Sequence, residues 1–345
     1  DLQLTGITLN GHYNAAIDTI VQDGRIVCAS ATARSVGCNP VNIFTDAPVS
    51  VPQFLWMAPD AGPYQHNTFK QDAAALSLNF APFSTWAGEV AVAMGAEWRE
   101  ESFTISPGDG PSTAIGPLTE QGFALGSNGF NGFSARTAGT FDRRNWAAYA
   151  DLEAQLTERF LLAGALRYED YDSFGSTTTG KLTGRFDFNE NFAVRGAYNT
   201  GFRAPTPGQA NISQISTAFN GSVLEDIATL PPTNPIAILK GARALTPEES
   251  KNLSLGMVWS SGDWLVTLDG YRIEVEDRIT LSENLTSTAV RNYLNANGFP
   301  GLGGGRYFTN AIDTTTRGVD VVGTYAWQLQ DSTLDLTLGY NYNKT

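Results

Sequence analysis

A period-two alternation of apolar and polar residues runs through most of this chain and constrains its fold more than any other feature. From Leu334 to Tyr342 every even-numbered residue is Leu or Tyr, while the odd-numbered residues are Asp, Thr, Gly and Asn. Because successive side chains of a β-strand point to opposite sides, each such segment has one apolar and one polar face. The alternation predicts an all-β chain of about eleven strands.

The same pattern recurs along the chain, in segments 76–80, 90–98, 148–156, 162–168, 182–188, 192–198, 253–259 and 319–327. In the segment that starts at Trp264 the alternation slips near Gly270. Such a slip indicates either a β-bulge or a strand that leaves the apolar layer.

The connections between these strands alternate in length. One set is short, at 82–85, 157–158, 189–191, 260–263 and 328–331; the other is long, at 10–67, 105–143, 204–248 and 282–306, with one tight exception at 173–176. Short turns at one end and long loops at the other are typical of a transmembrane antiparallel β-barrel whose long loops lie outside the cell. The alternative is a soluble sandwich whose apolar face is its core, but one-sided loops of this length are unusual there.

Composition excludes several other classes. The chain has 345 residues, of which 42% are hydrophobic and 17% charged, and Asp and Glu outnumber Lys and Arg by 35 to 22. A disordered chain would carry more charge and fewer aromatic residues, and a nucleic-acid-binding protein would normally carry a basic excess. Two Cys and two His are too few for a zinc ribbon or an iron–sulfur protein, so we expect no metal and no cofactor.

The motifs that could carry catalysis are weak. Residues 175–182 read G-S-T-T-T-G-K-L, which is one residue short of a phosphate-binding loop and opens a strand rather than a helix. The pairs Glu248-Glu249 and Glu169-Asp170 are interpreted as solvated strand ends rather than as an acid–base or calcium site. His12 and His66 have no serine or metal-ligand partner in the sequence, which disfavours an outer-membrane lipase or protease, and we expect no enzyme activity.

Cys28 and Cys38 both lie in the first long loop, ten residues apart. A pair of cysteines that closes a short loop suits an oxidising compartment, where a disulfide would stabilise the loop by limiting its unfolded conformations. We expect a structural disulfide here; two unpaired buried thiols are the alternative.

Several segments together resemble the TonB-dependent outer-membrane receptors. Tyr198-Asn199-Thr200-Gly201-Phe202-Arg203-Ala204-Pro205-Thr206 resembles their signature where a strand enters a long loop, and residues 245–253, 269–279 and 317–321 are similar to the strands that follow. The Cys28 and Cys38 loop, followed by residues 94–99, is similar to a cysteine-loop subset of the family. The resemblance covers most of residues 20–345.

This resemblance implies a 22-stranded barrel around an N-terminal plug domain, in the outer membrane of a Gram-negative bacterium. It implies uptake of a scarce solute (a siderophore, a vitamin or an oligosaccharide), with the TonB complex pulling on the plug by means of the proton gradient. Residues 1–345 are then expected to be part of the barrel domain, with the plug and the closing strands outside them. The expected partners are outer-membrane lipid, the protein's own plug, the TonB complex through that plug, and a small-molecule or glycan ligand; the alternative is a passive porin-like channel.

Two sets of residues are expected to carry the function. Charged and polar side chains on the inward strand face are expected to contact the plug: Glu97, Arg99, Asp151, Glu153, Arg185, Asp187, Arg195 and Asn199. Aromatic residues of the long loops are expected either to stack on the ligand or to pack the loops together: Phe54, Trp56, Tyr64, Tyr293 and Tyr307. No long loop carries a basic cluster that would attract an anionic ferric siderophore, which favours a neutral or glycan-like solute.

Overall fold

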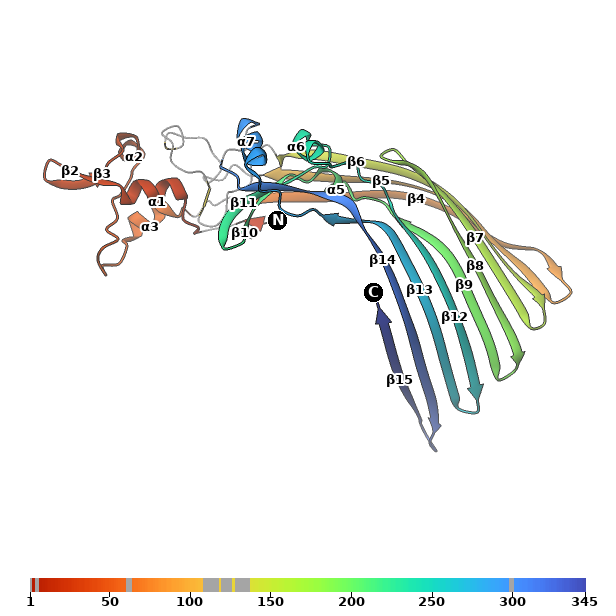
Figure 1. Ribbon diagram of the computed structural model, residues 1–345. Helices are drawn as coiled ribbons and strands as arrows, with labels where there is room; N and C mark the ends of the chain where they lie inside the picture. Colours follow the sequence, from red (N-terminus) through yellow and green to blue (C-terminus); the bar gives the residue numbers. More distant parts are fainter. Residues whose placement is uncertain are drawn as a thin grey trace.

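The computed structural model describes residues 2–3, 6–59, 64–107, 118, 126–127, 137–297 and 301–345. The main body of the molecule is one curved sheet of 13 strands, which forms an open trough in Figure 1. The predicted all-β architecture is confirmed, and the barrel is not closed within the described residues.

Ten long strands make up most of the sheet, and each is antiparallel to its neighbour in the order of the chain. They are β4 (Tyr64–Thr85), β5 (Gly88–Pro107), β6 (Gly139–Thr157), β7 (Phe160–Tyr171), β8 (Gly175–Asn189), β9 (Phe192–Arg203), β12 (Glu248–Ser261), β13 (Trp264–Leu281), β14 (Gly304–Gln328) and β15 (Thr333–Lys344). The two-residue strand β1 (Leu2–Gln3) pairs with β4. Because directly paired residues of neighbouring strands point to the same side, side chains in register share a face across the sheet.

The long connections after β9 and β13 contain secondary structure of their own. Strands β10 (Gln214–Asn220) and β11 (Val223–Leu230) form a hairpin that pairs in parallel with the start of β14. The same connections contain the helices α5 (Pro207–Asn211), which packs on β5 and β6, and α6 (Pro235–Leu239) and α7 (Thr288–Ala296). Strand β11, α6 and α7 share a small apolar core, which consists of Ala228, Leu230, Ile236, Val290, Leu294 and Leu302.

Residues 6–59, which we call the disulfide module, form a separate small unit at the loop end of the sheet (Figure 1). It contains α1 (Asn10–Ile17), the β2 (Thr19–Gln22) and β3 (Arg25–Cys28) hairpin, α2 (Ala31–Ser35) and α3 (Val51–Met57). Two small apolar clusters, one around Cys28 and one around Met57, form its interior.

The apolar face of the sheet has no second layer over it among the described residues. Leu166, Leu255 and Leu338 lie on this face and are 64%, 70% and 69% exposed. In a soluble sandwich these side chains would be the core, so the sandwich alternative is wrong and the face needs a lipid environment.

Two local predictions need correction, and the structure decides between the two alternatives for the slip at Gly270. The expected turn at 82–85 is wrong, because β4 continues to Thr85 through a register irregularity between Phe80 and Phe83. Gly270 pairs in register with Leu255 and Val319, so the bulge lies further on, between Val275 and Arg278. The slip at Gly270 therefore marks the point where the strand leaves the apolar layer.

The loops predicted for 10–67 and 204–248 contain helices and short strands.

None of the helices in the described ranges is long and apolar enough to span a membrane.

Candidate functional site

Aromatic side chains mark where the apolar face ends near the short turns. Phe188 contacts Phe186 at 4.9 Å and Phe192 at 5.5 Å between ring centroids, and Trp264 contacts Tyr325 at 4.7 Å. Toward the long loops, Trp146 and Tyr168 are 5.2 Å apart. Two such girdles bound the lipid-facing band of a membrane barrel, so the opposite, polar face is the wall of the lumen.

A ladder of ion pairs crosses the polar face between β5 and β7. Arg167 donates to Glu97 and to Glu169, each at 2.6 Å, although Glu97 lies two strands away. Tyr171 and Asn145 also donate to Glu169, at 2.9 and 3.2 Å, and Glu169 is buried. The interpretation of Glu169 as a solvated strand end is therefore wrong. The three hydrogen bonds to Glu169 and the one to Glu97 hold Arg167 in a fixed position on the lumen wall.

Arg143 connects this wall to the loop that follows β9. Its guanidinium donates to Glu101 and to the carbonyl oxygen of Pro205, and it lies 5.5 Å from the centre of the Tyr171 ring. Both members of the Arg143–Glu101 pair are nearly buried. Buried charges of this kind are stable only as a pair, so Arg143 fastens the loop to the barrel rim.

Two of the predicted lumen arginines form ion pairs. Arg195 donates to both oxygens of Asp269, at 2.9 and 2.6 Å, and Arg185 donates to Asp187 on its own strand at 2.8 Å. Gly256 lies in register between Arg195 and Asp269, on the strand that separates them. A Cβ on Gly256 would lie 2.0 Å from a carboxylate oxygen of Asp269, so only glycine allows this pair.

A hollow of about 530 Å³ lies in the polar wall beside the ladder. Asp151, Lys181, Tyr149 and Asn199 line it, and Asn199 accepts a hydrogen bond from Asn252 at 2.8 Å. The remaining predicted lumen residues, Arg99 and Glu153, are in register with Asn145 and Ala91. The eight predicted residues thus follow one alternating face, and their contact with a plug stays a prediction.

A second junction fastens the strands near the rim. Glu248 accepts two hydrogen bonds from Arg203 and one from the backbone N–H of Ile279 at 2.7 Å. Glu248 is 7% exposed, so its interpretation as a solvated strand end is also wrong. The sequence shows Glu248 beside Glu249 but gives no sign of Arg203, which is 45 residues earlier in the chain.

A small cavity of about 220 Å³ lies between the loops at this rim. It is lined by polar side chains together with prolines and an aromatic ring, among them Asp142, Ser173, Phe174, Thr206, Asn211 and Thr233. The sequence analysis did not predict this cavity, because its walls come from β6, from the β7–β8 turn and from three separate stretches of the connection between β9 and β12.

The five predicted loop aromatics divide into two groups. Trp56 stacks on His12 at 4.4 Å, Tyr293 packs against the core around α7, and the buried Tyr307 donates to the carbonyl oxygen of Lys240 at 2.9 Å. Phe54 and Tyr64 are each 47% exposed. The first three rings hold loops together, and ligand contact stays a prediction for all five. Phe54 is exposed on α3, whereas Tyr64 begins β4 and shares the outward face of that strand with Leu76 and Leu78.

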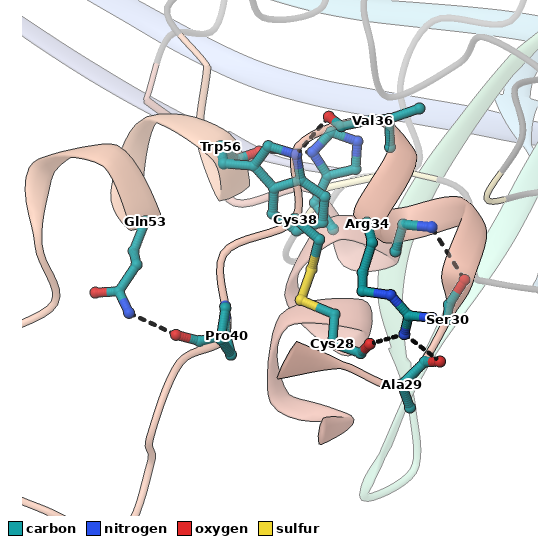
Figure 2. Close-up of a disulfide and its surroundings, with 11 residues drawn as sticks. Cys28, Ala29, Ser30, Arg34, Val36, Cys38, Pro40, Gln53 and Trp56 are labelled. Carbon is teal, nitrogen blue, oxygen red and sulfur yellow. Dashed lines mark hydrogen bonds between the residues drawn. A yellow bond between two sulfur atoms is a disulfide. The ribbon is translucent and has the colours of Figure 1, made fainter. Parts of the chain in front are cut away.

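The predicted disulfide between Cys28 and Cys38 is present. Figure 2 shows how hydrogen bonds surround it: Arg34 donates to the carbonyl oxygens of Cys28 and Ala29, and Trp56 donates to that of Val36 at 3.1 Å. Cys28 is completely buried. The disulfide therefore joins the end of β3 to the segment after α2 as a structural element.

No group of three His, Cys, Asp or Glu side chains in the described part of the chain is arranged to hold a metal ion.

The family model of the TonB-dependent receptor-like β-barrel matches residues 11–345. The chain belongs to this family. As a TonB-dependent receptor barrel it is part of a protein of the Gram-negative outer membrane.

Curated relatives of this TonB-dependent receptor chain match it over shorter stretches. An iron-regulated outer membrane virulence protein of Vibrio cholerae is 25% identical over 179 residues, which are 49% of this chain and 25% of that protein. The vitamin B12 transporter of Vibrio cholerae is 37% identical over 65 residues, 19% of this chain and 10% of that protein. A probable TonB-dependent siderophore receptor of Acinetobacter baumannii is 25% identical over 63% of this chain and 26% of its own length.

Solved receptors share the fold. The siderophore receptor PirA of Pseudomonas aeruginosa aligns with a TM-score of 0.56 at 17% identity, over 81% of this chain and 44% of that chain. A mutant of the ferric enterobactin receptor of Pseudomonas aeruginosa, in complex with enterobactin, aligns with a TM-score of 0.54 at 15% identity, over 80% of this chain and 36% of that chain. This TonB-dependent receptor chain thus spans less than half the length of the relatives and structures that it matches.

Proposed function

We propose that the protein containing this chain is an outer-membrane receptor that takes up a scarce solute by TonB-coupled active transport. The observation that carries the proposal is the match of the receptor barrel model over residues 11–345. Residues 1–345 then form part of the barrel domain, and a plug domain occupies the lumen.

The wall of the lumen supports this proposal. Many of its charges are already paired within the wall, as in Arg167 with Glu97 and Arg195 with Asp269. A plug can contact such a wall through hydrogen bonds that exchange with water. Little free energy is then needed to release the plug when it is pulled. Polar side chains that line the hollow, such as Lys181 and Asp151, are suitable contact points for the plug.

The long-loop end of the sheet supports a role in ligand capture. The rim cavity, Phe54 and Tyr64 offer hydroxyl, amide and aromatic groups to a solute. Relatives are named for iron regulation, siderophores and vitamin B12, so a metal chelate or vitamin is the first class to test, and an oligosaccharide is the second.

Uptake by a deletion strain that expresses the full-length gene tests the proposal. Labelled ferric siderophore, vitamin B12 or oligosaccharide should accumulate in the cells, and a proton uncoupler should abolish accumulation. Accumulation only down the concentration gradient, unaffected by the uncoupler, would instead indicate the porin-like alternative.

A further inference from the structure

The connection after β9 begins with a segment that crosses two neighbouring strands of the sheet. Residues 204–213, which we call the strap, contain α5, and α5 packs on β5 and β6. The strap therefore passes the ends of β8 and β7, which are joined by a tight turn at 172–174. The rim cavity of about 220 Å³ lies between the strap and this turn, with Pro205 and Asn211 on one side and Phe174 on the other. The position of the strap thus sets the shape of the cavity.

Tyr171 is the centre of the contacts that hold the strap. Its ring lies 5.5 Å from the guanidinium of Arg143, which donates to the carbonyl oxygen of Pro205. The ring also stacks on Phe174 at 4.5 Å and packs edge-on against Phe202 at 5.9 Å between ring centroids. Because Tyr171 is buried among these groups, the hold of Arg143 on the strap depends on the position of this ring.

The position of Tyr171 is connected in turn to the hollow in the lumen wall. Its hydroxyl donates to Glu169 at 2.9 Å, and Arg167 donates to both Glu169 and Glu97 at 2.6 Å. Glu97 and Arg167 line the hollow of about 530 Å³. One guanidinium thus serves two carboxylates. A group that takes Glu97 away from it leaves the guanidinium to Glu169, where it competes with the hydroxyl of Tyr171.

We propose that Glu97, Arg167 and Tyr171 are positioning residues that couple the hollow in the lumen wall to the strap above the rim cavity. Hydrogen-bond networks with two arrangements carry coupling of this kind between distant sites, and burial of Glu169 strengthens each bond in the chain. The use of this coupling rests on the proposed function, in which a plug occupies the lumen. A plug group that binds or releases Glu97 then changes the shape of the rim cavity through the barrel wall.

The same wall offers a matched control. Arg185 and Asp187 also form an ion pair on the lumen face, at 2.8 Å, and both side chains are partly exposed. They lie near the end of β8 at the short turns, whereas the strap lies at the long-loop end. D187N therefore removes a paired carboxylate from the wall, as E97Q does, but away from the connected residues.

Hydrogen exchange of the full-length protein in nanodiscs tests the coupling and needs no solute. The amides of Ala210 and Ile212 are suitable probes, because both are hydrogen-bonded within the strap. E97Q should accelerate their exchange by about threefold or more, although Glu97 lies two strands away from Tyr171. Y171F, which keeps the ring and loses the hydroxyl, should have a similar effect, and D187N should leave the strap at the wild-type rate.

The double variant E97Q/R143M separates coupling from a general loss of stability. If the effect acts through Arg143, E97Q adds nothing once that guanidinium is gone, so the strap should exchange equally fast in R143M and in the double variant. The proposal is overturned if E97Q leaves the strap at the wild-type rate, if D187N accelerates it as much, or if E97Q adds its full factor to R143M.

Exchange in β12 and β13 shows whether each variant still forms the barrel. If E97Q does not, Y171F decides the question by the same criteria, alone and combined with R143M. Uptake is measured separately, so a protein that transports none of the tested solutes can still show the coupling. Failure of the coupling and failure of the proposed function are therefore distinguishable.

Discussion

Arg195 and Asp269 form a two-point ion pair across an intervening strand, and they meet directly above Gly256. The three residues come from β9, β12 and β13, and they are in register with one another. Because Gly256 has no side chain, the two charged groups have room to meet directly across the intervening strand. The pair fixes the relative position of three strands on the lumen wall.

Replacing Gly256 with Ala should destabilise the barrel. The new Cβ would lie 2.0 Å from Asp269 and 3.2 Å from Arg195, so the pair must separate or the strand must shift, at a cost of about 1–3 kcal/mol. Thermal unfolding of the full-length protein in detergent, followed by circular dichroism, measures this loss. Gly323→Ala is the control, because nothing lies within 4 Å of a Cβ there; equal effects of the two changes would contradict the explanation.

Replacing Arg143 with Met should release the loop after β9. It would leave the buried carboxylate of Glu101 without its partner, which typically costs about 3–5 kcal/mol. Limited proteolysis should then cut within residues 203–213 much faster than in the wild type. The double variant R143M/E101M should recover much of the stability, and Arg144→Met, on the opposite and exposed face, should cost about 1 kcal/mol or less.

Removing the disulfide should loosen the disulfide module and leave the barrel intact. In C28S/C38S the module should lose about 2–4 kcal/mol of local stability, because its unfolded loop is no longer constrained. Hydrogen exchange should accelerate within residues 6–59 and remain unchanged in β5 to β9. Faster exchange in those strands as well would show that the module supports the barrel.

Removing an exposed loop ring should weaken ligand capture without affecting folding. Phe54→Ala and Tyr64→Ala should each raise the Kd of the full-length protein for its solute by about five- to tenfold if the ring stacks on it. Tyr307→Phe, which loses only the hydrogen bond to Lys240, should change stability rather than affinity. An unchanged Kd in both alanine variants would show that these rings do not contact the solute.

The alternation of apolar and polar residues predicts the strands and their two faces, but it does not predict which charged side chains form ion pairs with each other. Leu334 to Tyr342 specifies a strand and its two faces, since side chains alternate along any strand. The partners of Arg167 and Glu248 could not be predicted, because Glu97 and Arg203 are 70 and 45 residues away in the chain. The sequence interpretation of Glu248 failed for this reason, because its cation comes from another strand. Glu169 is buried instead by Arg167 and Tyr171 of its own strand together with Asn145 of β6.

The sequence by itself determined that the chain forms a membrane sheet with short turns at one end, long loops at the other and a cysteine pair in the first loop. These features depend on residues close together in the chain, through side-chain alternation and turn length. The tertiary structure alone decided which charges meet on the lumen wall, and that the Arg195–Asp269 pair crosses the neighbouring strand at Gly256. Those features depend on strand register, which is set by pairing between segments far apart in the sequence.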